Sequence, residues 1–147
     1  MLVLVALIQL AGAADDGWQA TLDRVTRGVV SIRMDRPRAF EGKGRSNSYA
    51  TGFVIDAERG LILTNRHVVT PGPTVAKAVF LDHEEVPLVP IYRDPVHDFG
   101  VFRYDPGDLR FLEAPSLQLR PDKARVGVPI RVVGNDAGEQ ISILDGT

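Results

Sequence analysis

The sequence predicts an all-β domain, either an antiparallel barrel or a sandwich, that follows one short helix. From residue 50 onward, short runs rich in β-branched and aromatic residues follow one another at close intervals, with Gly, Pro and Asp turns between them. No long helical period interrupts these runs. A chain of 147 residues that is 44% hydrophobic and 24% charged has the size and composition of one globular domain.

The first fourteen residues, "MLVLVALIQLAGAA", form an apolar leader that contains only Gln9 as a polar residue. This stretch is shorter than the roughly 20 residues of a membrane-spanning helix. The small residues 11–13 fit a signal-peptidase site, in which case the mature chain begins at Ala14, but no Lys or Arg precedes Arg24. The alternatives are a chain start that differs from that of the mature protein and an apolar segment that packs on a neighbouring domain.

A short amphipathic helix is predicted next, over residues 17–27. Asp15 and Asp16 are residue types that cap helix N-termini. The apolar residues that follow are spaced three to four apart, as one face of a helix requires; they are Trp18, Leu22 and Val25.

The rest of the chain is predicted to consist of strands. The predicted strands are "GVVSIRM" (28–34), "ATGFVID" (50–56), "LILT" (61–64), "TVAKAVFL" (74–81), "VPLVPIY" (86–92), "FGVFRY" (99–104), "PIRVVGN" (129–135) and "QISIL" (140–144). The stretch 35–49, "DRPRAFEGKGRSNSY", contains many charges, a proline and two glycines, so we expect a surface loop there.

Charge and cysteine content exclude several classes of function. A net charge of −2 and a pI near 5.9 give no basic face for nucleic acid, so we expect no such partner. The absence of cysteine excludes a disulfide framework, a thiolate nucleophile and Cys-ligated zinc.

Histidines are the main candidates for chemistry, and the chain has three of them. His67 lies just past the strand in "ILTNRHVV", and His97 precedes Asp98 before another strand, whereas His83 in "LDHEEV" is expected to be an exposed turn residue. No spacing is diagnostic of a metal site, so we expect neither metal nor cofactor. The residues that could conceivably form one are His67, His83, Glu84, His97 and Asp98.

A histidine that acts as a base needs a carboxylate at its other ring nitrogen, which fixes the tautomer and stabilises the imidazolium. Asp98 follows His67 by 31 positions, and each residue lies beside a predicted strand, so the two can meet across a small barrel. Spacing alone also allows His67 to be a structural, hydrogen-bonded histidine. His67 and Asp98 are therefore the candidate catalytic pair.

Three stretches carry a resemblance to a known family: "TGFVIDAERGLILTNRHVV", "PIYRDPVHDFGVFRYDP" and "RVVGNDAGEQISILDGT". They resemble the protease domain of the HtrA (Deg) family of trypsin-like serine endopeptidases, and most of all its large fungal nuclear, pro-apoptotic branch, over residues 18–147. The resemblance implies the N-terminal six-stranded antiparallel barrel of a two-barrel, chymotrypsin-like protease. It also implies that His67 is the general base and that Asp98 orients it. Arg66 stands where bacterial relatives commonly have alanine, and it suits the fungal branch.

The nucleophile of such an enzyme is expected later in the sequence, because chymotrypsin-like proteases follow the order His, Asp, Ser. None of the five serines lies in a Gly-x-Ser-Gly setting. We therefore expect residues 17–147 to be a partial protease domain, the first barrel and the start of the second, that is inactive alone. The five are Ser31, Ser46, Ser48, Ser116 and Ser142.

Two other functions stay open at this stage. The chain could be a catalytically inactive binding or regulatory module that docks on a full-length relative, or an unrelated small β-barrel binding domain in which His67 and Asp98 lie far apart. The resemblance implies protein or peptide substrates, PDZ domains in the full-length protein, a homo-oligomer, and a nuclear role in apoptosis and protein quality control. The apolar leader indicates secretion or a membrane surface instead.

Overall fold

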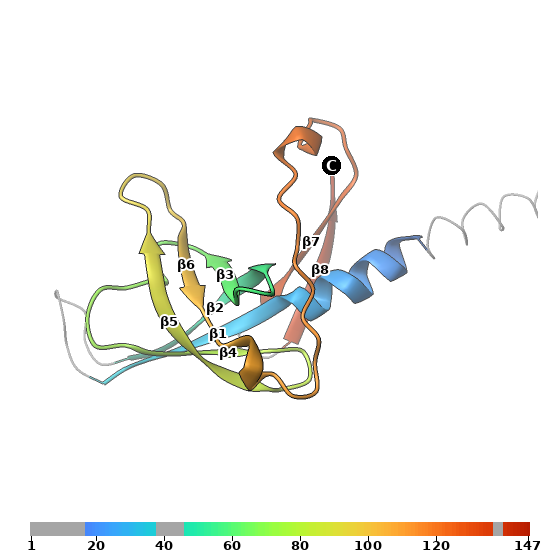
Figure 1. Cartoon of the computed structure of the whole chain (residues 1–147). Helices are drawn as coiled ribbons and strands as arrows, with labels where there is room; N and C mark the ends of the chain where they lie inside the picture. Colours follow the sequence, from blue (N-terminus) through green and yellow to red (C-terminus); the bar gives the residue numbers. More distant parts are fainter. Residues whose placement is uncertain (1–16, 38–45, 137–139) are drawn as a thin grey trace, which may run out of the picture.

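The computed structural model describes residues 17–37, 46–136 and 140–147. In these ranges the chain forms a β-barrel, a helix over residues 17–28, and a two-stranded hairpin that projects from the barrel (Figure 1). The strands are β1 (Val29–Arg36), β2 (Ser46–Asp56), β3 (Leu61–Thr64), β4 (Val75–Val79), β5 (Glu85–Arg93), β6 (Gly100–Arg103), β7 (Ile130–Asp136) and β8 (Gln140–Gly146). Two short 3-10 helices, η1 (Pro106–Asp108) and η2 (Pro121–Lys123), lie between β6 and β7.

The barrel is closed, with the strand order β1-β2-β3-β6-β5-β4 and antiparallel pairing throughout. Strand β1 closes it by pairing with β2 on one side and with β4 on the other. Closure gives every barrel strand two neighbours. The predicted all-β class is confirmed as a six-stranded barrel, and the sandwich alternative is wrong.

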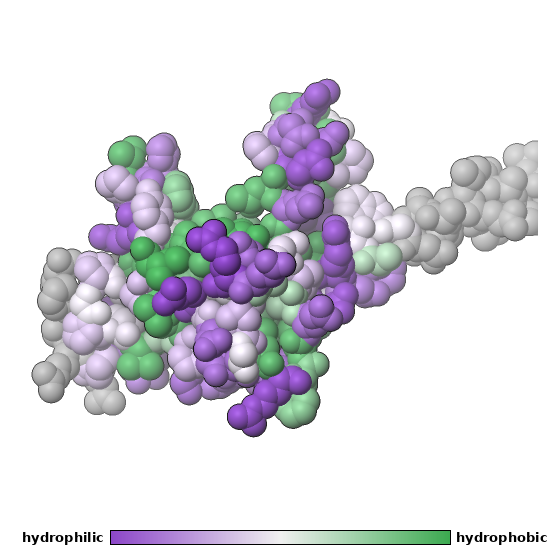
Figure 2. All heavy atoms as spheres, viewed as in Figure 1, coloured by the Kyte–Doolittle hydropathy of each residue, from purple (hydrophilic) through white to green (hydrophobic). Residues whose placement is uncertain are grey.

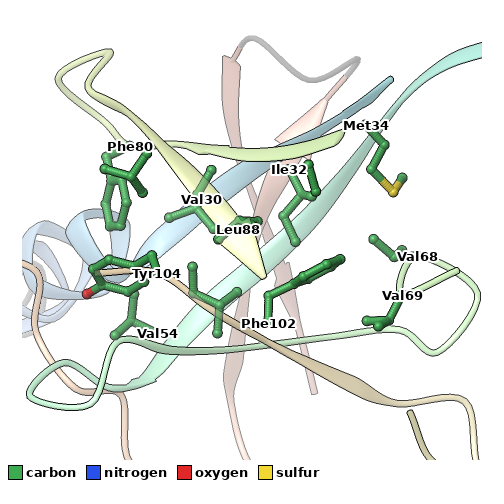
Figure 3. Close-up of a cluster of buried hydrophobic side chains, with 14 of the residues drawn as sticks. Val30, Ile32, Met34, Val54, Val68, Val69, Phe80, Leu88, Phe102 and Tyr104 are labelled. Carbon is green, nitrogen blue, oxygen red and sulfur yellow. The ribbon is translucent and has the colours of Figure 1, made fainter. Parts of the chain in front are cut away.

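Alternate side chains of the strands fill the barrel interior, as the two-residue period of a strand requires. In β1, Ile32 is fully buried while its neighbour Arg33 is exposed. Side chains from every barrel strand and from the turn after β3 meet in one cluster (Figure 3). Its members are Val30, Ile32, Met34, Val54, Ile62, Val68, Val69, Ala76, Ala78, Phe80, Val86, Leu88, Phe102, Tyr104 and Ala114.

The turn between β2 and β3 depends on Gly60. Its φ of 66° lies in the left-handed region that favours glycine. A Cβ atom at this position would lie 2.1 Å from the carbonyl oxygen of Tyr104, whose N–H donates to the Gly60 carbonyl at 2.9 Å. The glycine therefore lets the backbone after β6 approach the turn closely.

The prediction of a loop over residues 35–49 is wrong at both ends. Strand β1 continues to Arg36 and β2 begins at Ser46, and these two residues pair with each other. The side chains at this end of the hairpin are polar and mostly exposed, so no hydrophobic alternation marks it as strand. Residues 38–45 lie outside the described residues.

The helix and the β7–β8 hairpin contact each other beside the barrel. The guanidinium of Arg131 in β7 lies 4.7 Å from the ring centroid of Trp18 in the helix. The N–H of Asn135 donates to the Thr51 hydroxyl of β2 at 3.2 Å, which ties the hairpin to the barrel. The apolar leader lies outside the described residues, and no helix within those residues is long and apolar enough to cross a membrane.

Candidate active site

The pairing of β3 with β6 brings the two candidate catalytic segments together. Thr64, the last residue of β3, pairs with Gly100, the first residue of β6. His67 follows β3 by three residues and Asp98 precedes β6 by two, so both lie at the same end of the barrel. The pair therefore meets from neighbouring strands, and not across the barrel as the sequence suggested.

His67 lies on a tight turn that the core anchors. The Asn65 carbonyl accepts the N–H of Val68 at 3.1 Å, which closes the turn. Val68 and Val69 are each 3% exposed and enter the core cluster (Figure 3). The two valines fix the turn from below, whereas the His67 side chain remains 68% exposed.

Asp98 binds the His67 turn with both carboxylate oxygens. Its Oδ2 lies 2.9 Å from His67 Nδ1, and its Oδ1 accepts the His67 backbone N–H at 3.1 Å. Asn65 adds a third interaction, because its side-chain amide donates to Asp98 Oδ2 and to the Asp98 carbonyl, each at 3.3 Å. Such contacts fix both the position and the rotation of the imidazole. The predicted proximity of His67 and Asp98 is confirmed.

The hydrogen bond from the His67 side chain holds the pKa of the Asp98 carboxyl below its ordinary value of 3.8. The bonds from the His67 backbone and from Asn65 act in the same direction, and partial desolvation opposes them. Asp98 is therefore ionised at neutral pH. An ionised carboxylate at Nδ1 favours the tautomer that leaves Nε2 free to accept a proton.

Arg66 and Asn65 are site residues whose roles the sequence did not predict. The guanidinium of Arg66 donates from Nη1 to the Pro95 carbonyl at 3.2 Å, so it connects the His67 turn to the loop that carries Asp98. Asn65 does the same through its amide. The one sequence feature that could have indicated these roles is the position of both residues in the polar "TNRH" that ends an apolar strand.

The five residues considered for a metal site do not assemble. Among the described residues no group of three or more His, Cys, Asp and Glu side chains is placed to hold a metal ion. His83 is an exposed turn residue, as predicted, with a φ of 67°. His97 contacts Asp94, with 3.3 Å between Nδ1 and Oδ1.

Glu84 has a structural role that the sequence did not reveal. Its carboxylate accepts three backbone N–H groups from the segment after η1, at 2.7, 3.1 and 3.0 Å. The donors are Arg110, Phe111 and Leu112, and the bond from Arg110 contributes most to a lowered pKa of the Glu84 carboxyl. Glu84 therefore fastens the chain leaving the barrel onto the β4–β5 turn.

The ring of His67 hydrogen-bonds to Asp98, and two of the five serines form hydrogen bonds elsewhere in the described residues. The Ser116 hydroxyl accepts the Ala57 N–H at 2.9 Å, and the Ser46 hydroxyl accepts from Arg36 at 3.0 Å. Ser31 is 5% exposed within β1, and Ser142 lies in β8. Among the described residues, Asp98 is the hydrogen-bonded partner of the His67 ring.

A closed antiparallel barrel that carries a His–Asp pair at one end is an arrangement typical of trypsin-like peptidases. Residues 50–147 match the trypsin-like peptidase domain family, and the chain belongs to this family. Its relatives are of the HtrA type, which confirms the resemblance seen in the sequence.

The curated relatives are much longer than this chain. "Protease Do-like 7" of Arabidopsis thaliana is 52% identical over 141 residues, which cover 96% of this chain and 13% of that protein. The "Pro-apoptotic serine protease NMA111" of Chaetomium globosum is 57% identical over 129 residues, 88% of this chain and 12% of that protein. The protein of the same name from Aspergillus terreus is 54% identical over 142 residues, 95% of this chain and 14% of that protein.

Solved structures agree on the fold. The HtrA-type protease AlgW with a tripeptide superposes with a TM-score of 0.67 at 24% identity, covering 85% of this chain and 37% of that one. The same protease with a decapeptide gives a TM-score of 0.63 at 21% identity, covering 85% and 43%. At this level of identity the likeness shows the fold alone.

Proposed function

We propose that this chain provides the general base and the orienting aspartate of a Ser-His-Asp triad in an HtrA-type serine endopeptidase. The observation that carries the proposal is the 2.9 Å contact between His67 Nδ1 and Asp98 Oδ2 at one end of the barrel. The arrangement leaves the imidazole exposed on its other side, where a substrate and a nucleophile must approach.

In the complete enzyme, a serine hydroxyl attacks the carbonyl carbon of a peptide bond while His67 Nε2 accepts its proton. The tetrahedral intermediate then loses the amine, which takes that proton from His67, and leaves an acyl-enzyme. Water attacks the ester by the same route and restores the serine. Asp98 stays ionised throughout, holds the ring and stabilises the imidazolium formed in each step.

We place the nucleophile and the oxyanion hole outside these 147 residues. The hydrogen bond of the His67 ring goes to Asp98, no serine of the chain lies in a Gly-x-Ser-Gly setting, and the chain spans 12 to 14% of the curated relatives described above. On this reading residues 17–147 comprise the first barrel, with β7 and β8 beginning the second, and the chain alone does not hydrolyse peptides.

We also propose a biological setting for the chain, based on the names of its relatives. AlgW is described with bound peptides and the fungal relatives as pro-apoptotic proteases, so we propose protein or peptide substrates and a role in apoptosis and protein quality control. A nuclear location, PDZ domains elsewhere in the full-length protein and a homo-oligomeric state belong to the same proposal.

Casein cleavage by two chains tests the proposal, and light scattering and circular dichroism report whether each is folded and dispersed. One is the 147-residue chain, and the other continues through the expected Gly-x-Ser-Gly segment. Only the longer chain is expected to cleave casein. In that chain His67→Ala should abolish cleavage and Asp98→Asn should lower kcat by roughly 10⁴-fold, because it favours the wrong imidazole tautomer.

His83→Asn is the matched control, because it replaces an exposed histidine away from the pair with a residue that tolerates a positive φ. It should leave cleavage unchanged. Cleavage by the short chain that disappears in His67→Ala would mean that one of its five serines is the nucleophile. Full activity of the longer chain carrying His67→Ala would remove His67 from the mechanism.

A further inference from the structure

A second aspartate, Asp94, lies under the loop that carries Asp98. It follows the last residue of β5 and is 8% exposed, although its loop is otherwise open to solvent. Its backbone N–H donates to the Phe99 carbonyl at 3.0 Å, which joins the two ends of the loop. Asp98 is therefore part of a short closed loop with Asp94 at its base.

The Asp94 carboxylate organises the inside of this loop. Its Oδ1 accepts the backbone N–H of Val96 at 2.9 Å and that of His97, and its Oδ2 accepts the hydroxyl of Tyr92 at 2.9 Å. The His97 ring also contacts Oδ1 and stacks on Phe99, with 6.3 Å between ring centroids. The Tyr92 ring also packs on Phe99, at 5.8 Å between centroids. One carboxylate thus fixes two consecutive backbone amides and a side chain from β5.

Asp98 needs such support because burial does not hold it. Its side chain is 48% exposed, and the hydrogen bonds to its carboxylate come from His67 and Asn65, so the placement of that carboxylate also depends on the loop backbone. The two amides that Asp94 fixes belong to Val96 and His97, the residues directly before Asp98. A misplacement of about 1 Å at a catalytic group can cost on the order of a hundredfold in rate.

We propose that Asp94 is a positioning residue of the catalytic pair: it holds the loop so that the Asp98 carboxylate meets His67 Nδ1. The inference rests on the proposed function of His67 and Asp98. Asp94 touches neither substrate nor His67, and it acts through the Val96 and His97 amides. Arg66 also supports this loop, by donating to the Pro95 carbonyl.

The charge of Asp94 is constant over the working range of a protease. The N–H groups of His97 and Val96, with the Tyr92 hydroxyl, hold the pKa of its carboxyl at about 2. Tyr92 and His97 are the titratable groups that contact it, and the bond to Asp94 raises the pKa of Tyr92. Asp94 therefore serves as a permanent acceptor, and its effect depends on where its oxygens lie.

The test compares Asp94→Asn, Asp94→Glu and Asp94→Ala in the 147-residue chain by NMR. Asn keeps an acceptor oxygen in place of Oδ1, whereas Glu keeps the charge but moves both oxygens by one methylene. The readouts are the pKa of Asp98 from its carboxyl ¹³C shift and the protonation of His67 Nδ1 from the ring ¹⁵N shifts. Asp105→Ala is the matched control, because Asp105 also precedes a proline and accepts a loop N–H, at Gly107, but lies after β6.

In the unsubstituted chain the pKa of Asp98 should lie below 3.8, with the proton on His67 Nδ1. Asp94→Ala and Asp94→Glu should raise that pKa towards 3.8 and weaken the Nδ1 signature, whereas Asp94→Asn and Asp105→Ala should not. If Asp94→Ala does not fold, the contrast between Asn and Glu decides. Folded Ala or Glu variants with an unchanged Asp98 pKa overturn the inference and leave the pair intact. Absence of the Nδ1 signature in the unsubstituted chain overturns the proposed function itself.

Discussion

Gly100 is the position where a single methyl group should disturb both the barrel and the site. It pairs with Thr64 of β3 on one side and with Arg93 of β5 on the other, so its backbone has no room to shift. A Cβ atom there would lie 2.6 Å from Val69 Cγ2 and 3.1 Å from the Tyr92 carbonyl oxygen. Gly100→Ala therefore forces Val69, which anchors the His67 turn, away from β6.

Two opposing effects set the size of the change. Overpacking in a well-packed core costs about 1–3 kcal/mol. Replacing glycine returns about 0.4–1 kcal/mol by restricting the unfolded chain. The clash is the larger effect, so Gly100→Ala should lower the free energy of unfolding by roughly 1–2 kcal/mol and Tm by roughly 3–8 °C.

Urea unfolding followed by circular dichroism measures this change, and a double-mutant cycle with Val69→Ala assigns it. Val69→Ala alone should cost about 1–3 kcal/mol through the cavity it leaves. In the double variant the new methyl group occupies part of that cavity, so the combined loss should fall short of the sum by about 1 kcal/mol or more. Gly134→Ala is the control, since its Cβ would meet Thr51 Oγ1 at 3.8 Å and no closer atom of the described residues. Strict additivity, or a Gly100→Ala variant as stable as the original chain, would refute the packing argument.

Three further predictions concern the turns and carboxylates. Gly60→Ala should lower the free energy of unfolding in urea far more than Gly127→Ala does. Both glycines have a positive φ, but of the two only Gly60 has a backbone oxygen 2.1 Å from the position of the new Cβ. Equal losses of stability would contradict this prediction. The pKa of Asp94 in the folded chain, about 2, lies below the ordinary 3.8, so the stabilisation from its carboxylate is complete above about pH 4 and is lost as pH falls towards 2. Asp94→Asn should therefore flatten the fall in unfolding free energy at low pH, measured from pH 2 to 6, and an unchanged fall would count against this assignment. Glu84→Ala should speed hydrogen exchange at the amides of residues 110–112, while core amides such as that of Ile62 stay protected. If residues 110–112 exchange as slowly in the variant as in the original chain, the Glu84 carboxylate does not hold this segment.

Local pattern was sufficient to predict most elements of the barrel. The apolar run "LILT" is strand β3 with its predicted ends, and the described helix covers residues 17–28, one residue beyond the predicted end. Where local pattern failed, the side chains were polar on both faces. The pairing of Arg36 with Ser46 is an example, because a strand without a buried face has no alternation to read.

The candidate pair was predictable in chemistry but not in arrangement. A carboxylate is required beside a histidine base, and the resemblance supplied Asp98. That β3 and β6 are neighbours depends on a non-sequential strand order, which no local pattern records. Asp94 binds N–H groups two and three residues ahead, a local pattern that the Asp94-Pro95 dipeptide signalled but that the prediction of strands did not use. Glu84 binds N–H groups 26 to 28 residues further along the chain, which no local pattern records.

Because the barrel is closed, the unpaired strand edges that could pair with another copy of this chain lie outside it. Every barrel strand has two neighbours, whereas β7 and β8 pair only with each other within the described residues. Figure 1 shows one end of this hairpin beside β1 and the helix and its other end extending beyond the barrel, and Figure 2 shows hydrophobic residues between it and the β5–β6 end. Unpaired strand edges with exposed apolar side chains, here Ile130, Val132 and Leu144, are templates for strand addition by another copy. We therefore expect self-association to begin at the hairpin, so that the aggregated chain keeps an intact barrel and an intact His67–Asp98 contact.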